Sequence, residues 1–267
     1  MVLPMKNPES WYFLMERFWI RTAVNYVVWL RLPPLITFSP KVIFSIMSSL
    51  SQSTLKKGGK CIVFDFDGVL ADSFDCLYSL NKRALFLVGI NLPVDKYQDF
   101  FNSNFHSALK SYIKEPASYE KVLKFRKRNF EVYYSKADLF PEVPPLIKNL
   151  ATKNYLAIAS STKSVFINPL LRRHYLKRYF KRVIGTLDYS KEAVLKEIIS
   201  AIKVKPNQTI MVTDTTGDIR VAKRMGLGTI AVTWGYQPLN LLKKAKPDMI
   251  AKTFEELEAT LNGDNQV

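Results

Sequence analysis

The chain has 267 residues, of which 48% are hydrophobic, and a formal net charge of +16 at pH 7. This apolar content supports a large core and argues against a disordered chain, and the length allows one domain with an inserted module. Two cysteines are too few for a disulfide framework, so we expect both to have packing roles in a reducing compartment, the cytoplasm.

The positive charge is spread along the chain, and residues 61–73, with three Asp and neither Lys nor Arg, are the acidic exception. A spread charge of this kind is typical of a solvated surface that attracts anionic ligands. We find neither zinc-finger spacing nor an RNP-like aromatic motif, and therefore expect no nucleic-acid partner.

Residues 1–59 differ from the remainder and are interpreted as an N-terminal extension with three of the four tryptophans. Residues 11–30 are apolar but contain one Glu and two Arg, which argues against a simple membrane-spanning helix. Three interpretations stay open: a peripheral membrane anchor within residues 11–50, a targeting segment for an organelle, or a mis-assigned start with Met47 as the true one. The third is slightly favoured.

The first expected element is a buried strand over Cys61–Phe64, four apolar residues typical of a parallel sheet. Asp65 and Asp67 follow it, and Gly68 comes next. Side chains two apart along an extended chain point the same way, so the two carboxylates should converge. Their mutual repulsion favours a bound divalent cation, although a plain Asp-Gly turn accounts for the same residues.

From residue 74 to about 140 the pattern is helical throughout, and prolines separate the segments. The expected helices here are Phe74–Val88, Tyr97–Ile113 and Tyr119–Tyr134. From residue 141 onward strands alternate with helices, which predicts a parallel sheet with helices on both faces. The expected strands are Leu156–Ala159, Arg182–Gly185, Thr209–Thr213 and Thr229–Thr233. The expected helices are Pro144–Thr152, Val165–Phe180, Lys191–Ile202, Ile219–Met225 and Phe254–Leu261.

The fold class is therefore α/β, a Rossmann-like parallel sheet formed by residues 60–73 and 141–267, with an all-helical insertion over residues 74–140. In such a sheet, ligands bind at the carboxyl ends of the strands. Ser160, Ser161 and Thr162 follow the second strand, where their hydroxyls suit phosphate oxygens. An N-cap run that opens the next helix explains the same residues.

A third set of polar residues follows the strand that ends at Thr213. Asp214 comes directly after it and Asp218 lies at the start of a helix, where a carboxylate could also serve as a cap. Asp214 should point to the same edge as the first two aspartates, and three oxygen ligands suit Mg²⁺. Lys191 begins an earlier helix, where the helix dipole disfavours a cation; this hints at another role, although an ordinary surface lysine is the alternative.

In chain order these pieces are Asp65-Phe66-Asp67-Gly68-Val69, then Ser160, then Lys191, then Asp214-Thr-Thr-Gly-Asp218. The ordered set resembles the four motifs of the haloacid dehalogenase-like hydrolase superfamily, over about residues 60–250. It is most similar to the branch of phosphoglycolate phosphatase and β-phosphoglucomutase. In that branch a small helical cap is inserted into the catalytic core directly after the first motif. The resemblance implies that the helical insertion here is such a cap.

Two departures from the family pattern are modest. The hydroxyl motif is Ser160-Ser161-Thr162, where many phosphatases of this kind have Thr-Asn, and Thr213 stands where glycine is frequent before the last motif. The dehalogenases proper lack the second aspartate of the first motif, so Asp67 favours phosphate chemistry over carbon–halogen chemistry.

The resemblance implies that Asp65 is the nucleophile that forms an aspartyl-phosphate and that Asp67 is the general acid and then the general base. It implies a Mg²⁺ cofactor bound by Asp65, Asp67 (through its backbone carbonyl) and Asp214. Asp218 would orient the lysine of the third motif or a metal-bound water.

The resemblance also implies that Ser160, Ser161 and Lys191 bind the phosphoryl oxygens, with Lys191 counted as catalytic. The implied activity is a Mg²⁺-dependent phosphatase for a small phosphorylated metabolite. A phosphomutase and a non-catalytic regulatory member of the fold are the alternatives. The cap should act as a lid, and its cations could meet a second anionic group, although solvated helix faces explain them better. These cations are Lys82, Arg83, His106, Lys110, Arg126 and Arg128.

Overall fold

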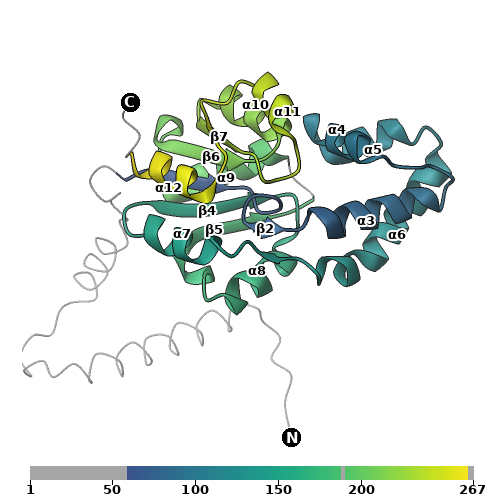
Figure 1. The fold of residues 1–267 in the computed structure, drawn as a ribbon, viewed down its shortest axis with the longest axis horizontal. Coiled ribbons are helices and arrows are strands. Elements are labelled where there is room, and N and C mark those ends of the chain that lie inside the picture. Colours follow the sequence, from purple (N-terminus) through teal and green to yellow (C-terminus); the bar gives the residue numbers. More distant parts are fainter. Residues whose placement is uncertain (1–58, 188–189, 264–267) are drawn as a thin grey trace, which may run out of the picture. The chain divides into compact units, whose positions relative to one another are not determined.

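The structure, a computed structural model, describes residues 59–187 and 190–263. Its main sheet has six parallel strands in the order β5-β4-β1-β6-β7-β8 (Figure 1). These are β1 (Cys61–Phe64), β4 (Tyr155–Ser160), β5 (Phe180–Gly185), β6 (Thr209–Thr213), β7 (Gly228–Val232) and β8 (Met249–Ala251). The expected α/β fold class is confirmed, whereas the interpretations of the N-terminal extension fall almost wholly outside the described residues.

Strand β1 lies at the centre of the sheet and is buried on both faces, which explains its unbroken run of apolar residues. Ile62 and Phe64 belong to one apolar cluster. This cluster also contains buried residues of helices α7 (Val143–Leu150), α8 (Ser164–Arg173) and α12 (Phe254–Asn262). Cys61 and Val63 point the other way, toward α9 (Lys191–Ile202) and α10 (Thr216–Arg224). Helices therefore cover both faces of the sheet.

The helical segment that follows β1 is bracketed by a two-stranded antiparallel ladder. Strand β2 (Ala71–Asp72) leads out of the main sheet and β3 (Asp138–Leu139) leads back. Between them lie α3 (Phe74–Phe86), α4 (Val94–Asp99), the short 3-10 helix η1 (Phe100–Asn102), α5 (Phe105–Tyr112) and α6 (Pro116–Tyr134). We call residues 74–134 the inserted helices.

The element predictions were wrong in two places. The helix expected over Tyr97–Ile113 is broken into three pieces, because Ser103 is extended and Asn104 starts a new helix by accepting a hydrogen bond from the Ser107 amide. The helix expected over Val165–Phe180 ends at Arg173, and after the turn η2 (Lys177–Tyr179) the chain enters β5.

Several short elements gave no periodic signal and were not predicted. They are β2, β3, β8, the 3-10 helix η3 (Pro206–Gln208) and α11 (Leu239–Lys244). In contrast, α9 and β6 have the predicted bounds, and the two cysteines are free and buried, as expected for packing residues.

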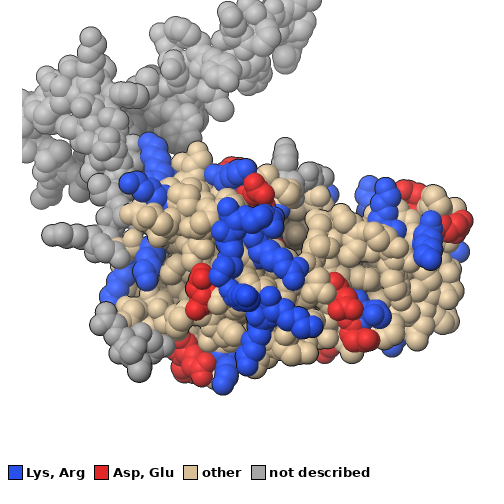
Figure 2. Space-filling model, turned by 90° about the horizontal axis from the view of Figure 1, so that it is seen from above, with Lys and Arg blue, Asp and Glu red and all other residues tan. Residues whose placement is uncertain are grey.

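Lysine and arginine side chains gather on the face of the molecule seen from above in Figure 2, where α10 and α11 lie. The exposed cations of these two helices and the following turn are Arg220, Lys223, Arg224, Lys243, Lys244 and Lys246. Within the described ranges, none of the helices combines the length and apolar character that crossing a membrane would require.

Candidate active site

The polar residues singled out in the sequence meet at one edge of the sheet, beyond the carboxyl ends of β1, β4 and β6. These three strands are neighbours and parallel, so their ends reach the same edge. Lys191 comes from α9, whose N-cap Ser190 accepts a hydrogen bond from the Ala193 amide and so places the lysine in the first helical turn.

Lys191 joins the other groups of the site. Its Nζ lies 3.0 Å from Oδ1 of Asp65 and 2.8 Å from Oδ2 of Asp218, and it donates to the carbonyl oxygen of Ala159 at 2.8 Å. Only 9% of the lysine side chain is exposed, so it is not an ordinary surface lysine. The cost of burying its charge is offset by two carboxylates and a carbonyl dipole.

Asp65 lies at the end of β1 with its backbone bonded to β6, since its amide donates to the carbonyl of Val212 at 2.9 Å. Its Oδ1 accepts a further hydrogen bond, 2.8 Å long, from the Phe66 amide. Burial raises the pKa of Asp65 well above its usual range; the lysine ammonium opposes this shift, and the neighbouring carboxylates of Asp218 and Asp214 add to it.

Asp67 is surrounded by hydroxyl groups. The Tyr134 hydroxyl donates to its Oδ1 at 2.9 Å, and the side chains of Thr162 and Ser73 also hydrogen-bond to it. Burial raises the pKa of Asp67, and these three hydrogen bonds oppose the shift. Tyr134 is the last residue of α6, so the inserted helices contribute a group to the site.

Asp214 is almost fully buried between two glycine turns. A Cβ on Gly68 or on Gly235 would overlap its carboxylate, and Gly68 has a φ of +76°, which favours glycine. The Tyr236 amide donates to Oδ2 at 2.7 Å, while Oδ1 is a buried oxygen without a hydrogen-bond partner among the described residues. Burial raises the pKa of Asp214 to about 7, although the Tyr236 amide opposes the shift.

The hydroxyl run after β4 is divided between two roles. Ser160 is buried, and its Oγ accepts a hydrogen bond from the Thr162 amide at 2.9 Å. Ser161 is exposed, whereas Thr162 is buried and bonds to Asp67. Thr162 therefore contacts Asp67, whereas Ser161, which was expected together with Ser160 to bind the phosphoryl oxygens, is exposed.

The site has more negative than positive charge. Four aspartates at positions 65, 67, 214 and 218 surround a single lysine. Burial alone would lower the pKa of Lys191, but the carboxylates of Asp218 and Asp65 outweigh it and hold that pKa above its usual range. The lysine therefore stays charged, and three negative charges remain uncompensated when all four aspartates are ionised.

The donor set fits a hard divalent cation. The clustered carboxylates and the buried Oδ1 of Asp214, which has no hydrogen-bond partner among the described residues, suit oxygen-ligand chemistry. Within residues 59–187 and 190–263, no three His, Cys, Asp or Glu side chains form a ready metal cage.

The inserted helices are fastened to the sheet through Asn102. Its Oδ1 accepts hydrogen bonds from the Thr216 hydroxyl at 2.9 Å and from Gln237 Nε2 at 3.1 Å, and its carbonyl accepts from Arg220 at 2.8 Å. A Cβ on Gly217 would lie 2.9 Å from the Phe101 carbonyl oxygen, so this glycine permits the close approach. We call this set of contacts the Asn102 latch.

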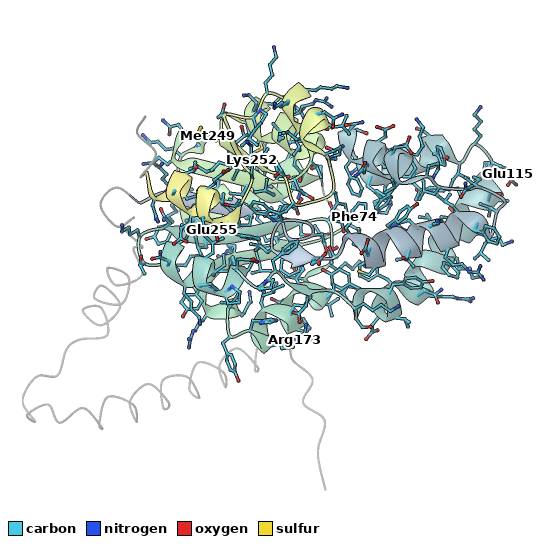
Figure 3. All side chains as sticks on the ribbon, viewed as in Figure 1. Phe74, Glu115, Arg173, Met249, Lys252 and Glu255 are labelled. Atoms are coloured by element: carbon cyan, nitrogen blue, oxygen red, sulfur yellow. The ribbon has the colours of Figure 1, made fainter. Side chains whose placement is uncertain are left out.

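Sequence reasoning missed several residues of this region. Tyr134 is the last residue of a predicted helix and carries no local signal, because only the return of α6 to the sheet brings it to Asp67. Phe74 packs edge-on against Tyr236 at 5.1 Å, where the chain leaves the sheet for α3 (Figure 3). The segment ending Val-Thr-Trp-Gly-Tyr236 did resemble the family, which was a usable signal for Tyr236.

A family model described as haloacid dehalogenase-like hydrolase matches residues 62–232, most of the described chain. The chain belongs to this family. The family and the enzyme class expected from the sequence are thereby confirmed.

Relatives and solved structures of this family cover most of the chain. A phosphoglycolate phosphatase from Synechococcus elongatus is 28% identical over 202 residues, which are 74% of this chain and 95% of that protein. The tyrosine-protein kinase PtkA from Mycobacterium tuberculosis is 26% identical over 208 residues, 75% of this chain and 72% of that protein. A haloacid dehalogenase-like hydrolase from Streptococcus pneumoniae has the same fold, with a TM-score of 0.68 at 21% identity over 76% of this chain and 99% of that one.

Proposed function

We propose that this haloacid dehalogenase-like hydrolase is a Mg²⁺-dependent phosphatase that hydrolyses a small phosphorylated metabolite through an aspartyl-phosphate on Asp65. The observation that carries the proposal is the contact of Lys191 with both Asp65 and Asp218, which holds a buried carboxylate and a fixed cation side by side. Relatives named phosphoglycolate phosphatase support a substrate of this class.

In the first step an oxygen of Asp65 attacks phosphorus and the bond from phosphorus to the ester oxygen breaks. The leaving oxygen takes its proton from Asp67. The raised pKa of Asp67 favours this role, since a general acid must hold its proton near neutral pH. The three hydroxyl groups around Asp67 orient its carboxyl group toward the leaving oxygen.

In the second step the ionised Asp67 accepts a proton from water as the water oxygen attacks phosphorus. The bond between phosphorus and the Asp65 oxygen breaks, and inorganic phosphate leaves. Lys191 and the Ser160 hydroxyl bind the equatorial phosphoryl oxygens, where charge accumulates in the transition state. Asp218 holds the lysine in place at 2.8 Å.

Asp65, Asp214 and the backbone carbonyl of Asp67 would hold Mg²⁺. The ion would supply charge neutralisation between the carboxylates and the phosphate dianion, which otherwise repel each other.

We further propose that residues 74–140 form a cap on a catalytic core of residues 60–73 and 141–267. The β2–β3 ladder is a natural boundary, since the chain leaves and returns there. A cap would exclude water and place its own side chains against the substrate.

The test is Asp65→Asn, a nearly isosteric change. We expect it to lower turnover of p-nitrophenyl phosphate and of a panel of phosphorylated metabolites by at least about 10⁴-fold, because an amide is no nucleophile. The measurement is phosphate release with and without Mg²⁺, with the thermal melt as a control for folding. Retained turnover in the variant would contradict the nucleophile assignment.

The same panel distinguishes the alternatives. Isomerisation of a sugar bisphosphate without phosphate release would indicate a phosphomutase. If the folded wild-type protein neither hydrolyses nor isomerises any compound of the panel, a non-catalytic member of the fold would be favoured.

A further inference from the structure

The six parallel strands begin at one edge of the main sheet and end at the other. We call the edge where they begin the amino edge; the candidate active site lies at the opposite, carboxyl edge. The six residues before each strand include at least one Lys or Arg in every case, and Asp248 is the single acidic residue among them. The segments that follow the strands contain all four aspartates of the site, so the two edges differ in charge.

One exposed cation from each of these six segments lies beside the start of a strand, within four residues of it. We call the six together the basic edge: Lys60, Lys153, Arg178, Lys205, Arg224 and Lys246. They precede β1, β4, β5, β6, β7 and β8 in that order. Neighbouring strands lie about 4.8 Å apart, so the six strand starts span about 24 Å. The basic edge is therefore a broad charged face.

The basic edge has little internal compensation for its charge. None of its six side chains takes part in an ion pair within residues 59–187 and 190–263. Asp248, the acidic residue of these segments, is already bound by the Lys223 ammonium at 3.0 Å and by the Thr229 amide at 2.8 Å. Like charges that gather without counter-charges favour an anionic partner.

Helix dipoles explain only part of this pattern. A cation in the last turn of a helix is favourable, and Arg224 of α10 is such a cation. Lys153, Lys205 and Lys246, however, lie beyond the last residues of α7, α9 and α11. Lys246 also has a φ of +52°, in the left-handed region where glycine or asparagine is usual. Cations are therefore present at positions that the local backbone does not favour for them.

The N-terminal extension joins the sheet at the same edge. Lys60 directly precedes β1, and its carbonyl accepts a hydrogen bond from the amide of Tyr155, the first residue of β4, at 3.0 Å. Residues 11–50 are rich in apolar and aromatic side chains, a composition that favours the membrane interface. One attachment signal gives marginal membrane binding, whereas an apolar signal combined with a polybasic surface gives stable binding. This chain has both signals, and they are connected at Lys60.

We propose that the basic edge docks on an anionic membrane surface, with the candidate active site at the opposite edge directed away from the bilayer. The six cations bind the phosphate and carboxylate groups of the lipids, and apolar residues of the extension enter the interface. A cation acts on a charged surface over about one Debye length, about 8 Å at physiological salt, so a broad face of cations suits a flat anionic surface. This inference concerns the location of the protein and does not depend on the proposed activity.

The experiment measures how the full chain sediments with vesicles of phosphatidylcholine, alone or with about 30% phosphatidylserine, at about 0.15 M salt. The edge variant combines Lys153→Gln, Lys205→Gln, Arg224→Gln and Lys246→Gln. We expect this variant to lower the partition coefficient for the anionic vesicles by at least about tenfold, because each cation near an anionic surface adds to the attraction. Binding of the wild-type protein should weaken as salt is added.

The matched control removes the same number of exposed cations from the inserted helices, through Lys110→Gln, Lys114→Gln, Lys124→Gln and Lys127→Gln. These helices follow the carboxyl end of β1 and lie to the right of the sheet in Figure 1. The control has the same net charge as the edge variant, and we expect its vesicle binding to stay within about threefold of wild type. Thermal melts establish that both variants are folded.

Equal losses in the two variants would attribute binding to net charge and overturn the proposal. Unchanged binding in the edge variant, equal binding of wild type to neutral and anionic vesicles, or no binding of wild type would overturn it as well. If a single-stranded RNA binds through the edge residues while vesicles do not bind, the edge is a nucleic-acid surface and the membrane proposal fails. Because no phosphate release is measured, these outcomes leave the proposed function untouched.

Discussion

At the scale of single residues, the site is built from carboxylates whose surroundings make them unequal. Asp65 shares a buried lysine with Asp218, Asp67 receives hydrogen bonds from three hydroxyl groups, and Asp214 is held between glycine turns. The proposed roles of nucleophile, of acid and base, and of metal ligand rest on these different neighbours of each aspartate.

Tyr134 gives a residue-scale prediction, because it was found only in the structure. Its hydroxyl favours the ionised form of Asp67, so Tyr134→Phe should raise the pKa of Asp67 further. We expect the step in the pH–rate profile that reports this group to move to higher pH by up to about one unit, with a modest loss of kcat. The measurement is kcat and kcat/KM on p-nitrophenyl phosphate between pH 5 and about pH 9.

The neighbouring Tyr133, which is half-buried and has no contact with Asp67 among the hydrogen bonds described, supplies the control. Tyr133→Phe should leave the profile in place. A Tyr134→Phe profile that coincides with wild type would show that this tyrosine does not act through Asp67.

At the scale of elements, the local sequence predicted the bounds of helix α9 better than those of the helices between β2 and β3. The N-cap Ser190 and the buried residues Val194, Leu195 and Ile198 have the spacing of an amphipathic helix, so the predicted bounds were correct. The expected helix at Tyr97–Ile113 failed at Asn102-Ser103-Asn104, where short polar side chains compete for backbone hydrogen bonds. That break frees Asn102 for the latch.

The latch gives an element-scale prediction. Asn102→Ala removes the side-chain hydrogen bonds to Thr216 and Gln237, each worth about 1 kcal/mol. If the inserted helices act as a lid, the closed form becomes less populated and KM rises by about 5- to 30-fold, with thermal stability changed by only a few degrees. Steady-state kinetics on the best substrate of the panel provides the measurement.

Asn129→Ala is the matched control, since Asn129 bonds only within α6, to the Phe125 carbonyl, among the contacts described. An equal change of KM in the two variants would attribute the effect to general loosening of the inserted helices rather than to the latch.

At the scale of the whole molecule, the described site residues lie between Phe64 and Gln237, within the part of the chain that the family model matches or directly adjoins. The family model begins at residue 62, beyond the first 46 residues. We therefore expect protein started at Met47 to keep the kcat/KM of the full chain within about twofold on the metabolite panel.

The same pair of proteins tests the anchor interpretation of residues 11–50. Full-length protein should sediment with anionic lipid vesicles, because apolar, aromatic and basic residues favour the membrane interface, while protein from Met47 should stay in the supernatant. Equal partitioning of the two proteins would remove the anchor.

The sequence by itself determined five of the six strands of the main sheet and the four motifs, because each rests on local patterns: apolar strands, turn residues and the order of Asp65, Ser160, Lys191 and Asp214 along the chain. The tertiary structure alone decided which side chains surround the residues of these motifs. Tyr134 reaches Asp67 from 67 positions away, and Arg126 is distinguished from Arg128 only by what packs around it. Burial and partnership depend on contacts between distant segments, and no local pattern encodes those contacts.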